Sequence, residues 1–86
     1  MRIDILMKKL CFVKTRSIAK KACDLKLVKI NDKISKASSI INSGDLLEFE
    51  LYGSKITVKI TDIPKGNVAK SSATNYYEMI SKEKLL

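Results

Sequence analysis

The residues most capable of chemistry in this chain are two cations beside a predicted helix start. Lys14-Thr15-Arg16-Ser17 separates two segments with helical apolar spacing, and Thr15 or Ser17 can cap the second helix. Backbone N–H groups at a helix N-terminus attract the same anion as the cationic side chains. Arg16 is one of two arginines beside 15 lysines, and a planar guanidinium can bind a phosphate through two hydrogen bonds. The segment therefore predicts a phosphate-binding site centred on Arg16.

The charge distribution supports an anionic partner. Residues 1–36 contain 11 Lys and Arg against three acids, a net charge of +8, whereas residues 37–86 contain six of each. A one-sided basic field is typical of a surface that meets phosphates or anionic lipid headgroups.

The composition argues against catalysis. The chain of 86 residues has no His and two Cys, so Cys/His nucleophile pairs and Cys/His zinc sites are excluded. Its acids are scattered singly, without the paired carboxylates of hydrolytic acid–base work. We therefore expect no enzyme activity, no metal and no cofactor. Cys11 and Cys23 lie among apolar neighbours and are predicted to be reduced, small core residues.

The elements that position these cations are predicted from apolar periodicity. Residues 3–13 have helical spacing, with Asp4 in the first turn, and residues 18–25 form a second short helix. After Leu27, apolar and polar residues alternate with a period of two. This pattern predicts a strand at Leu27–Ile30, a two-residue turn at Asn31-Asp32 and a partner strand at Lys33–Lys36.

A β-hairpin follows in the neutral half. Residues 47–51 and 56–60 each alternate apolar and polar side chains, and Gly53-Ser54 is the predicted two-residue loop, which pairs Leu51 with Ile56 and Phe49 with Val58. Pro64 ends the last strand, residues 65–72 are predicted to be a loop, and residues 73–82 a terminal helix. The expected fold class is α+β, a helix hairpin on a small antiparallel sheet with a short C-terminal helix. Residues 1–64 form the domain and residues 65–86 a loop and helical tail.

Four short motifs carry a family resemblance. They occur in the order Arg2-Ile3-Asp4, Lys14-x-Arg16-Ser17-x-Ala19, Val28-x-Ile30-Asn31 and Gly44-Asp45-x-Leu47. Together they resemble the S-four-type RNA-binding domain over about residues 1–51. The resemblance implies an alpha-L fold whose helix hairpin and adjacent turn bind structured RNA, chiefly ribosomal RNA and tRNA. Lys26 and Asp32 stand where the family usually has Gly, at positions that favour positive φ.

Within this family, the chain resembles the fifteen-kilodalton heat-shock protein and the small bacterial quality-control factors of stalled ribosomes. That resemblance implies binding to split large subunits that still carry nascent-chain tRNA. It also implies that the chain holds peptidyl-tRNA while a tailing factor, its possible protein partner, recruits charged tRNA. Larger relatives add a catalytic domain, for which this chain has no room.

The candidate RNA contacts are basic side chains of the first 36 residues. Some of the lysines can equally be a solvated face, and Arg2 can pair locally with Asp4 instead of binding RNA. Tyr76 and Tyr77 can stack on a base, although packing or plain exposure of such tyrosines is the commoner case. The predicted RNA-binding residues are Arg2, Lys8, Lys14, Arg16, Lys20, Lys21 and Lys36.

The sequence thus predicts a cytoplasmic, monomeric, non-enzymatic protein that binds rRNA and tRNA on the large ribosomal subunit. A role in ribosome assembly is an alternative within the same chemistry. A different class is a protein-interaction adaptor, in which the basic half meets an acidic partner and the edge of residues 52–61 accepts a strand. A membrane-surface role ranks third, and no segment reaches the roughly 18 to 20 apolar residues of a bilayer span.

Overall fold

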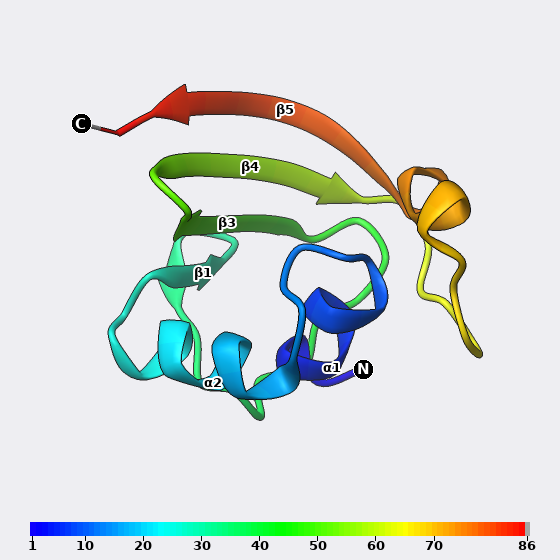
Figure 1. The fold of residues 1–86 in the computed structure, drawn as a ribbon, viewed down its shortest axis with the longest axis horizontal. Helices are drawn as coiled ribbons and strands as arrows, with labels where there is room; N and C mark the ends of the chain where they lie inside the picture. Colours follow the sequence, from blue (N-terminus) through cyan, green and yellow to red (C-terminus); the bar gives the residue numbers. More distant parts are fainter. Residues whose placement is uncertain (86) are drawn as a thin grey trace.

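The computed structural model describes residues 1–85 (Figure 1). Two helices, α1 (Ile3–Lys9) and α2 (Arg16–Asp24), precede a five-stranded antiparallel sheet. The strand order is β2-β1-β3-β4-β5. Both helices lie at the β1–β3 end of the sheet, and β5 runs along the opposite end (Figure 1). The α+β class is confirmed. The strands are β1 (Val28–Ile30), β2 (Lys33–Ile34), β3 (Leu46–Leu51), β4 (Ser54–Ile60) and β5 (Tyr77–Lys84), and a 3-10 helix, η1 (Lys70–Tyr76), precedes β5.

One apolar core joins the helices to the sheet. In α1, the apolar residues that recur every three or four positions are at most 1% exposed. Most of the core residues of β3 and β4 are buried to the same extent. α1 ends at Lys9, before the predicted Val13, because the chain turns at Cys11 with φ of 63°. The fully or nearly fully buried side chains include Ile3, Leu6, Met7, Leu10, Ala19, Val28, Leu47, Val58 and Ile60.

The two cysteines differ. Cys23 is buried, as predicted, and burial raises the pKa of its thiol, which keeps it protonated. The prediction for Cys11 is wrong: its side chain is exposed, because the chain reverses direction at this residue.

The connection from α2 through β1 to β2 depends on left-handed backbone positions. Lys26 has φ of 62°, and Asn31 and Asp32 have φ of 51° and 67°, as in a type I′ hairpin turn. These angles confirm the predicted two-residue turn and the positive φ expected at Lys26 and Asp32. The Asn31 side chain fixes the turn to the sheet, because its Oδ1 accepts the Leu46 N–H at 2.9 Å and its Nδ2 donates to Asp45 Oδ1 at 3.0 Å.

The register predicted for the β3–β4 hairpin is wrong by two residues. Leu51 pairs with Ser54 and Phe49 with Ile56, so the turn is formed by Tyr52 and Gly53. Both turn residues have positive φ, 53° and 76°, which a type I′ turn requires at its two central positions. A shift of two residues keeps every side chain on its predicted face, so the alternation could not detect the error.

The C-terminal region also corrects the prediction. The helix there is the 3-10 helix Lys70–Tyr76, and residues 77–82 of the predicted helix belong instead to β5, which continues to Lys84. β5 pairs with β4 along its length, with a bulge between Thr57 and Val58, so the tail is part of the sheet. The edge of residues 52–61 that the adaptor hypothesis required is therefore covered. The division of the chain at residue 64 stays a prediction.

Lys26→Gly is expected to raise the free energy of unfolding by up to about 1 kcal/mol, because glycine adopts positive φ without the steric cost that lysine bears. The matched control Lys20→Gly removes the same side chain from the interior of α2 and should cost about 1 kcal/mol. Urea unfolding of both variants measures the difference. Equal destabilisation by the two changes would contradict the conformational assignment at Lys26.

Candidate nucleic-acid interface

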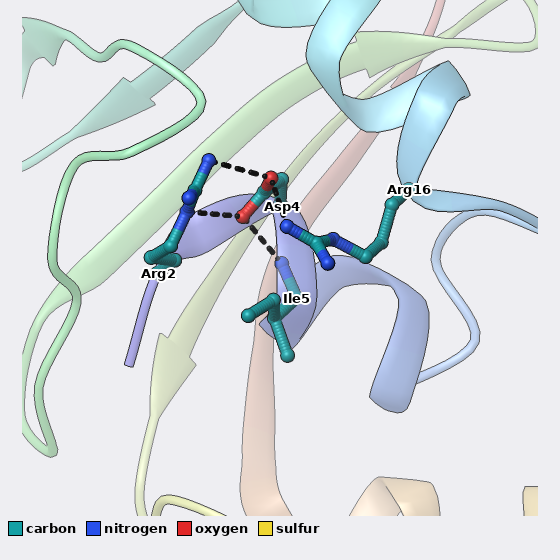
Figure 2. A network of polar contacts seen from close by, with 4 residues as sticks. All are labelled: Arg2, Asp4, Ile5 and Arg16. Atoms are coloured by element: carbon teal, nitrogen blue, oxygen red, sulfur yellow. Dashed lines mark hydrogen bonds and ion pairs between the residues drawn. The ribbon is translucent and has the colours of Figure 1, made fainter.

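A carboxylate shared by two arginines lies where the two helices begin. Asp4 Oδ2 accepts hydrogen bonds from Arg2 Nη2 at 3.1 Å and from Arg16 Nη2 at 3.2 Å. Its Oδ1 accepts from Arg2 Nε at 3.2 Å and from the Ile5 N–H at 2.9 Å. Figure 2 shows the two guanidinium groups on either side of the carboxylate. We call Arg2, Asp4 and Arg16 the arginine cluster.

The backbone places each member of the arginine cluster. Arg2 is the N-cap residue of α1, in extended conformation, and it forms a β-bridge with Ile40. Arg16 is the first residue of α2, whose N-cap Thr15 accepts the Ile18 N–H through its hydroxyl oxygen at 3.3 Å. Thr15 is one of the two predicted caps. The cluster therefore joins the starts of both helices across the hairpin.

The Asp4 side chain is charged although none of it is exposed. Burial by itself would raise the pKa of this carboxyl group. The hydrogen bond from Arg16, the positive charges of Arg2 and Arg16 and the Ile5 amide outweigh burial and lower the pKa below its usual range. The arginine side chains cover the carboxylate, so a negative charge sits beneath two positive ones.

Both arginines can also bind a ligand from solvent. Their side chains are 41% and 43% exposed. A guanidinium has five N–H donors, and the ion pair of Arg16 with Asp4 engages Nη2, which leaves further donors for a phosphate. The Arg2–Asp4 pairing considered as an alternative to RNA binding is present, and it is compatible with binding because the exposed part of each side chain remains available.

Two predicted lysines lie near the arginine cluster. Lys20 is four residues after Arg16 on α2, so the two share a helix face. Lys36 donates its N–H to Ser39 Oγ at 2.9 Å, and Ser39 O accepts the Ile3 N–H at 2.8 Å. Lys36 therefore belongs to the segment that runs beside the start of α1.

The other predicted lysines lie elsewhere. Lys21 is exposed in the last turn of α2. Lys8 and Lys14 line a pocket together with Lys70. The structure thus divides the predicted residues between the arginine cluster, a pocket and the outer side of α2.

Sequence reasoning assigned Asp4 to the helix dipole and overlooked its role as the anchor of Arg16. The spacing could have indicated that Asp4 is buried. Asp4 immediately follows Ile3 and lies three residues before Met7, and both of these are buried positions of α1. Phe12, Tyr52 and Lys70, which line the same pocket as Lys8 and Lys14, were also missed. They come from three separate segments, so no local pattern joins them.

Within residues 1–85, no group of three or more His, Cys, Asp or Glu side chains is placed to hold a metal ion. None of the helices in that range is long and apolar enough to cross a membrane.

Comparison with known proteins identifies the family of this arrangement. The S4 domain family model matches residues 1–47, which include α1, α2, β1 and β2. The chain belongs to the S4 domain family. The resemblance indicated by the motifs around Arg2, Arg16, Asn31 and Gly44 is thereby confirmed.

Two relatives of this S4 domain protein cover nearly its whole length. A protein of Bacillus subtilis is 33% identical over 85 residues, which are 99% of this chain and 98% of the relative. A protein of Halalkalibacterium halodurans is 31% identical over 83 residues, which are 96% of this chain and 93% of the relative. Both carry the name RQC P-site tRNA stabilizing factor.

Two solved structures share the fold of this S4 domain protein. Heat Shock Protein 15 of Vibrio cholerae, solved as a trimer, superimposes with a TM-score of 0.87 at 22% identity, over 94% of this chain and 82% of that one. The hypothetical protein HP1423 superimposes with a TM-score of 0.80 at 28% identity, over 96% of this chain and all of that one. The predicted likeness to the fifteen-kilodalton heat-shock protein is therefore confirmed at the level of fold.

Asp4→Asn is expected to lower the free energy of unfolding by about 1–3 kcal/mol at pH 7, because it removes charged hydrogen-bond acceptors. A carboxylate whose pKa is lowered by folding stabilises the protein at pH values above its unfolded pKa of about 3.8. This contribution is lost as the pH falls through the folded pKa. The gap between wild type and variant should therefore be full at pH 5–7 and shrink below about pH 4.

Urea unfolding between pH 7 and pH 2 measures that gap. Asp24→Asn, at an exposed position of α2, is the control and should change stability by less than about 0.5 kcal/mol. A gap between wild type and Asp4→Asn that stays constant down to pH 2 would show that Asp4 is not held ionised by the arginines.

Proposed function

We propose that this protein binds ribosomal RNA and tRNA on the large ribosomal subunit and stabilises peptidyl-tRNA on stalled, split ribosomes. The observation that carries the proposal is the arginine cluster, two half-exposed guanidiniums fixed on one buried carboxylate in the half of the chain that holds all the net charge. The relatives named RQC P-site tRNA stabilizing factor support the choice of tRNA and ribosome as partners. The site of action is the cytoplasm.

The proposed mechanism is positioning without catalysis. Phosphate contacts fix the register and orientation of a protein on a nucleic acid. Arg16 and Arg2 would bind phosphates in a fixed geometry, because Asp4 restricts their rotamers before the RNA arrives. Lys20 and Lys36, near the cluster, would add charge over a wider area. Cooperation with a nascent-chain tailing factor and action as a monomer are part of the same proposal.

A role in ribosome assembly uses the same RNA chemistry and differs in the particle bound. The adaptor hypothesis is weaker, because the β4 edge that it needed pairs with β5. Sedimentation therefore distinguishes large subunits that carry tRNA from precursor subunits. Substitution of Arg16 distinguishes an RNA partner from a protein partner.

In sucrose gradients of native lysate, tagged wild-type protein is expected to travel with large subunits that carry tRNA, and Arg16→Ala to remain near the top. The reason is that Arg16 supplies a charge-assisted contact whose loss should weaken binding about tenfold or more. Immunoblots of each fraction, with probes for tRNA and 23S-type rRNA, give the readout.

Lys59→Ala is the control, since it removes one cation from an exposed position of β4 outside the basic half. It should sediment as wild type does. Co-migration of wild type with precursor subunits that lack tRNA would favour assembly, and a wild-type protein that stays at the top would remove the ribosome as partner.

The affinity for purified tRNA is expected to fall with salt at a log–log slope of about four to five, as for about six phosphate contacts. Arg16→Ala should reduce that slope by about one. Asp4→Asn should weaken binding although it makes the protein more positive, because the arginines lose their fixed geometry. Filter binding between 50 and 300 mM KCl measures all three proteins.

The Asp4 variant separates positioning from net charge. Tighter binding by Asp4→Asn would mean that net charge alone sets affinity, and the positioning role would be wrong. A flat salt response of wild type would contradict phosphate binding altogether.

A further inference from the structure

A pocket of about 410 Å³ opens beside the turn that joins α1 to α2. Part of its lining is apolar or aromatic and comes from that turn and from the β3–β4 hairpin turn. Three lysines, Lys8, Lys14 and Lys70, belong to the same lining, and none of the lining residues within 1–85 is acidic. An apolar surface rimmed by cations suits a flat, unsaturated ligand that carries negative charge.

The Phe12 ring forms a rigid part of the lining. Its centroid lies 4.9 Å from that of Phe49 and 4.8 Å from that of Tyr77, both in tilted geometry. The Phe12 N–H also donates to Met7 O at 2.9 Å, which fixes the backbone of the turn to α1. An aromatic side chain held this way offers a preformed surface and loses little freedom when a ligand binds.

Tyr52 occupies its position at a conformational cost. It has φ of 53° in the hairpin turn, where Asn or Gly is favoured, and its side chain is 70% exposed. Cys11, in the same pocket, has φ of 63°. Neither turn geometry nor core packing accounts for an exposed ring at Tyr52. Strained backbone residues that packing does not explain cluster at ligand-binding sites.

We propose that this pocket binds one unpaired nucleobase of an RNA strand, in contact with Tyr52 and Phe12, while Lys8, Lys14 and Lys70 pair with the flanking phosphates. Aromatic side chains bind unpaired bases by stacking, and lysines follow the backbone. Lys14 precedes Arg16 by two residues, so one short segment of the chain contributes to both the pocket and the arginine cluster. The inference rests on the proposed function, and it adds an unpaired nucleotide to the structured RNA bound there.

The test is Tyr52→Asn, which replaces Tyr-Gly by Asn-Gly, a favoured type I′ sequence. Its melting temperature should equal or exceed that of wild type. Its affinity for a fluorescent eight-residue oligoadenylate at 50 mM KCl should fall about tenfold or more, because stacking on that ring is lost. Tyr52→Phe keeps an aromatic ring and should bind as wild type does.

Cys11 supplies an independent readout inside the pocket. Oligoadenylate should slow the alkylation of its exposed thiol by iodoacetamide, with the buried Cys23 as the unreactive internal reference. Inorganic polyphosphate of similar charge carries no bases and should protect Cys11 much less. Alkylation sites are assigned by peptide mass spectrometry.

Unchanged oligoadenylate affinity in Tyr52→Asn would overturn the proposal. Equal protection of Cys11 by polyphosphate would also overturn it, because the pocket would then bind anions without recognising bases. The proposed function fails separately: Arg16→Ala would then leave tRNA and large-subunit binding unchanged, whatever the Tyr52 variants do.

Discussion

The rest of the interface depends on a single buried negative charge. Asp4 has no exposed surface, yet it stays ionised because Arg2 and Arg16 approach it from the starts of the two helices. A buried carboxylate without these partners would be costly. The same ion pairs limit how the guanidiniums can move. The carboxylate therefore contributes to folding and fixes the geometry of the surface that is proposed to bind RNA.

The positions of the charged residues and of the strained backbone residues fit a surface that binds RNA. Residues 1–36 hold the whole net charge of +8, and their mutual repulsion opposes folding unless it is offset. The core beneath, to which both helices and the strands β1, β3 and β4 contribute buried side chains, supplies the offset. Within residues 1–85, five residues other than glycine have positive φ, and all lie in turns that join the elements. Three of them, Lys26, Asn31 and Asp32, shape the turns beside α2 and β1, while Cys11 and Tyr52 line the pocket.

Much of the fold was predictable where local periodicity matches burial. Both helices and the β3 and β4 strands were predicted, because their apolar spacing follows a single buried face. The four motifs around Arg2, Arg16, Asn31 and Gly44 together indicated the family that the S4 domain match confirms. The register of the β3–β4 hairpin could not be predicted, because a turn at Tyr52-Gly53 and a turn at Gly53-Ser54 place the same side chains on the same faces of the sheet. Only the pairing observed in the sheet, with positive φ at both turn residues, distinguishes them.

The sequence by itself determined the helix hairpin, the basic half and the place of Arg16 at the start of the second helix, since these depend on residue types and short spacings. The tertiary structure decided the state of residues 77–84, which lack clear alternation and form β5 because β4 offers them unpaired backbone groups. It also decided the partner of Arg16 and the members of the pocket. Asp4 and Arg16 are 12 residues apart, and Tyr52 and Lys70 come from separate turns, so only packing of the helices on the sheet brings them together.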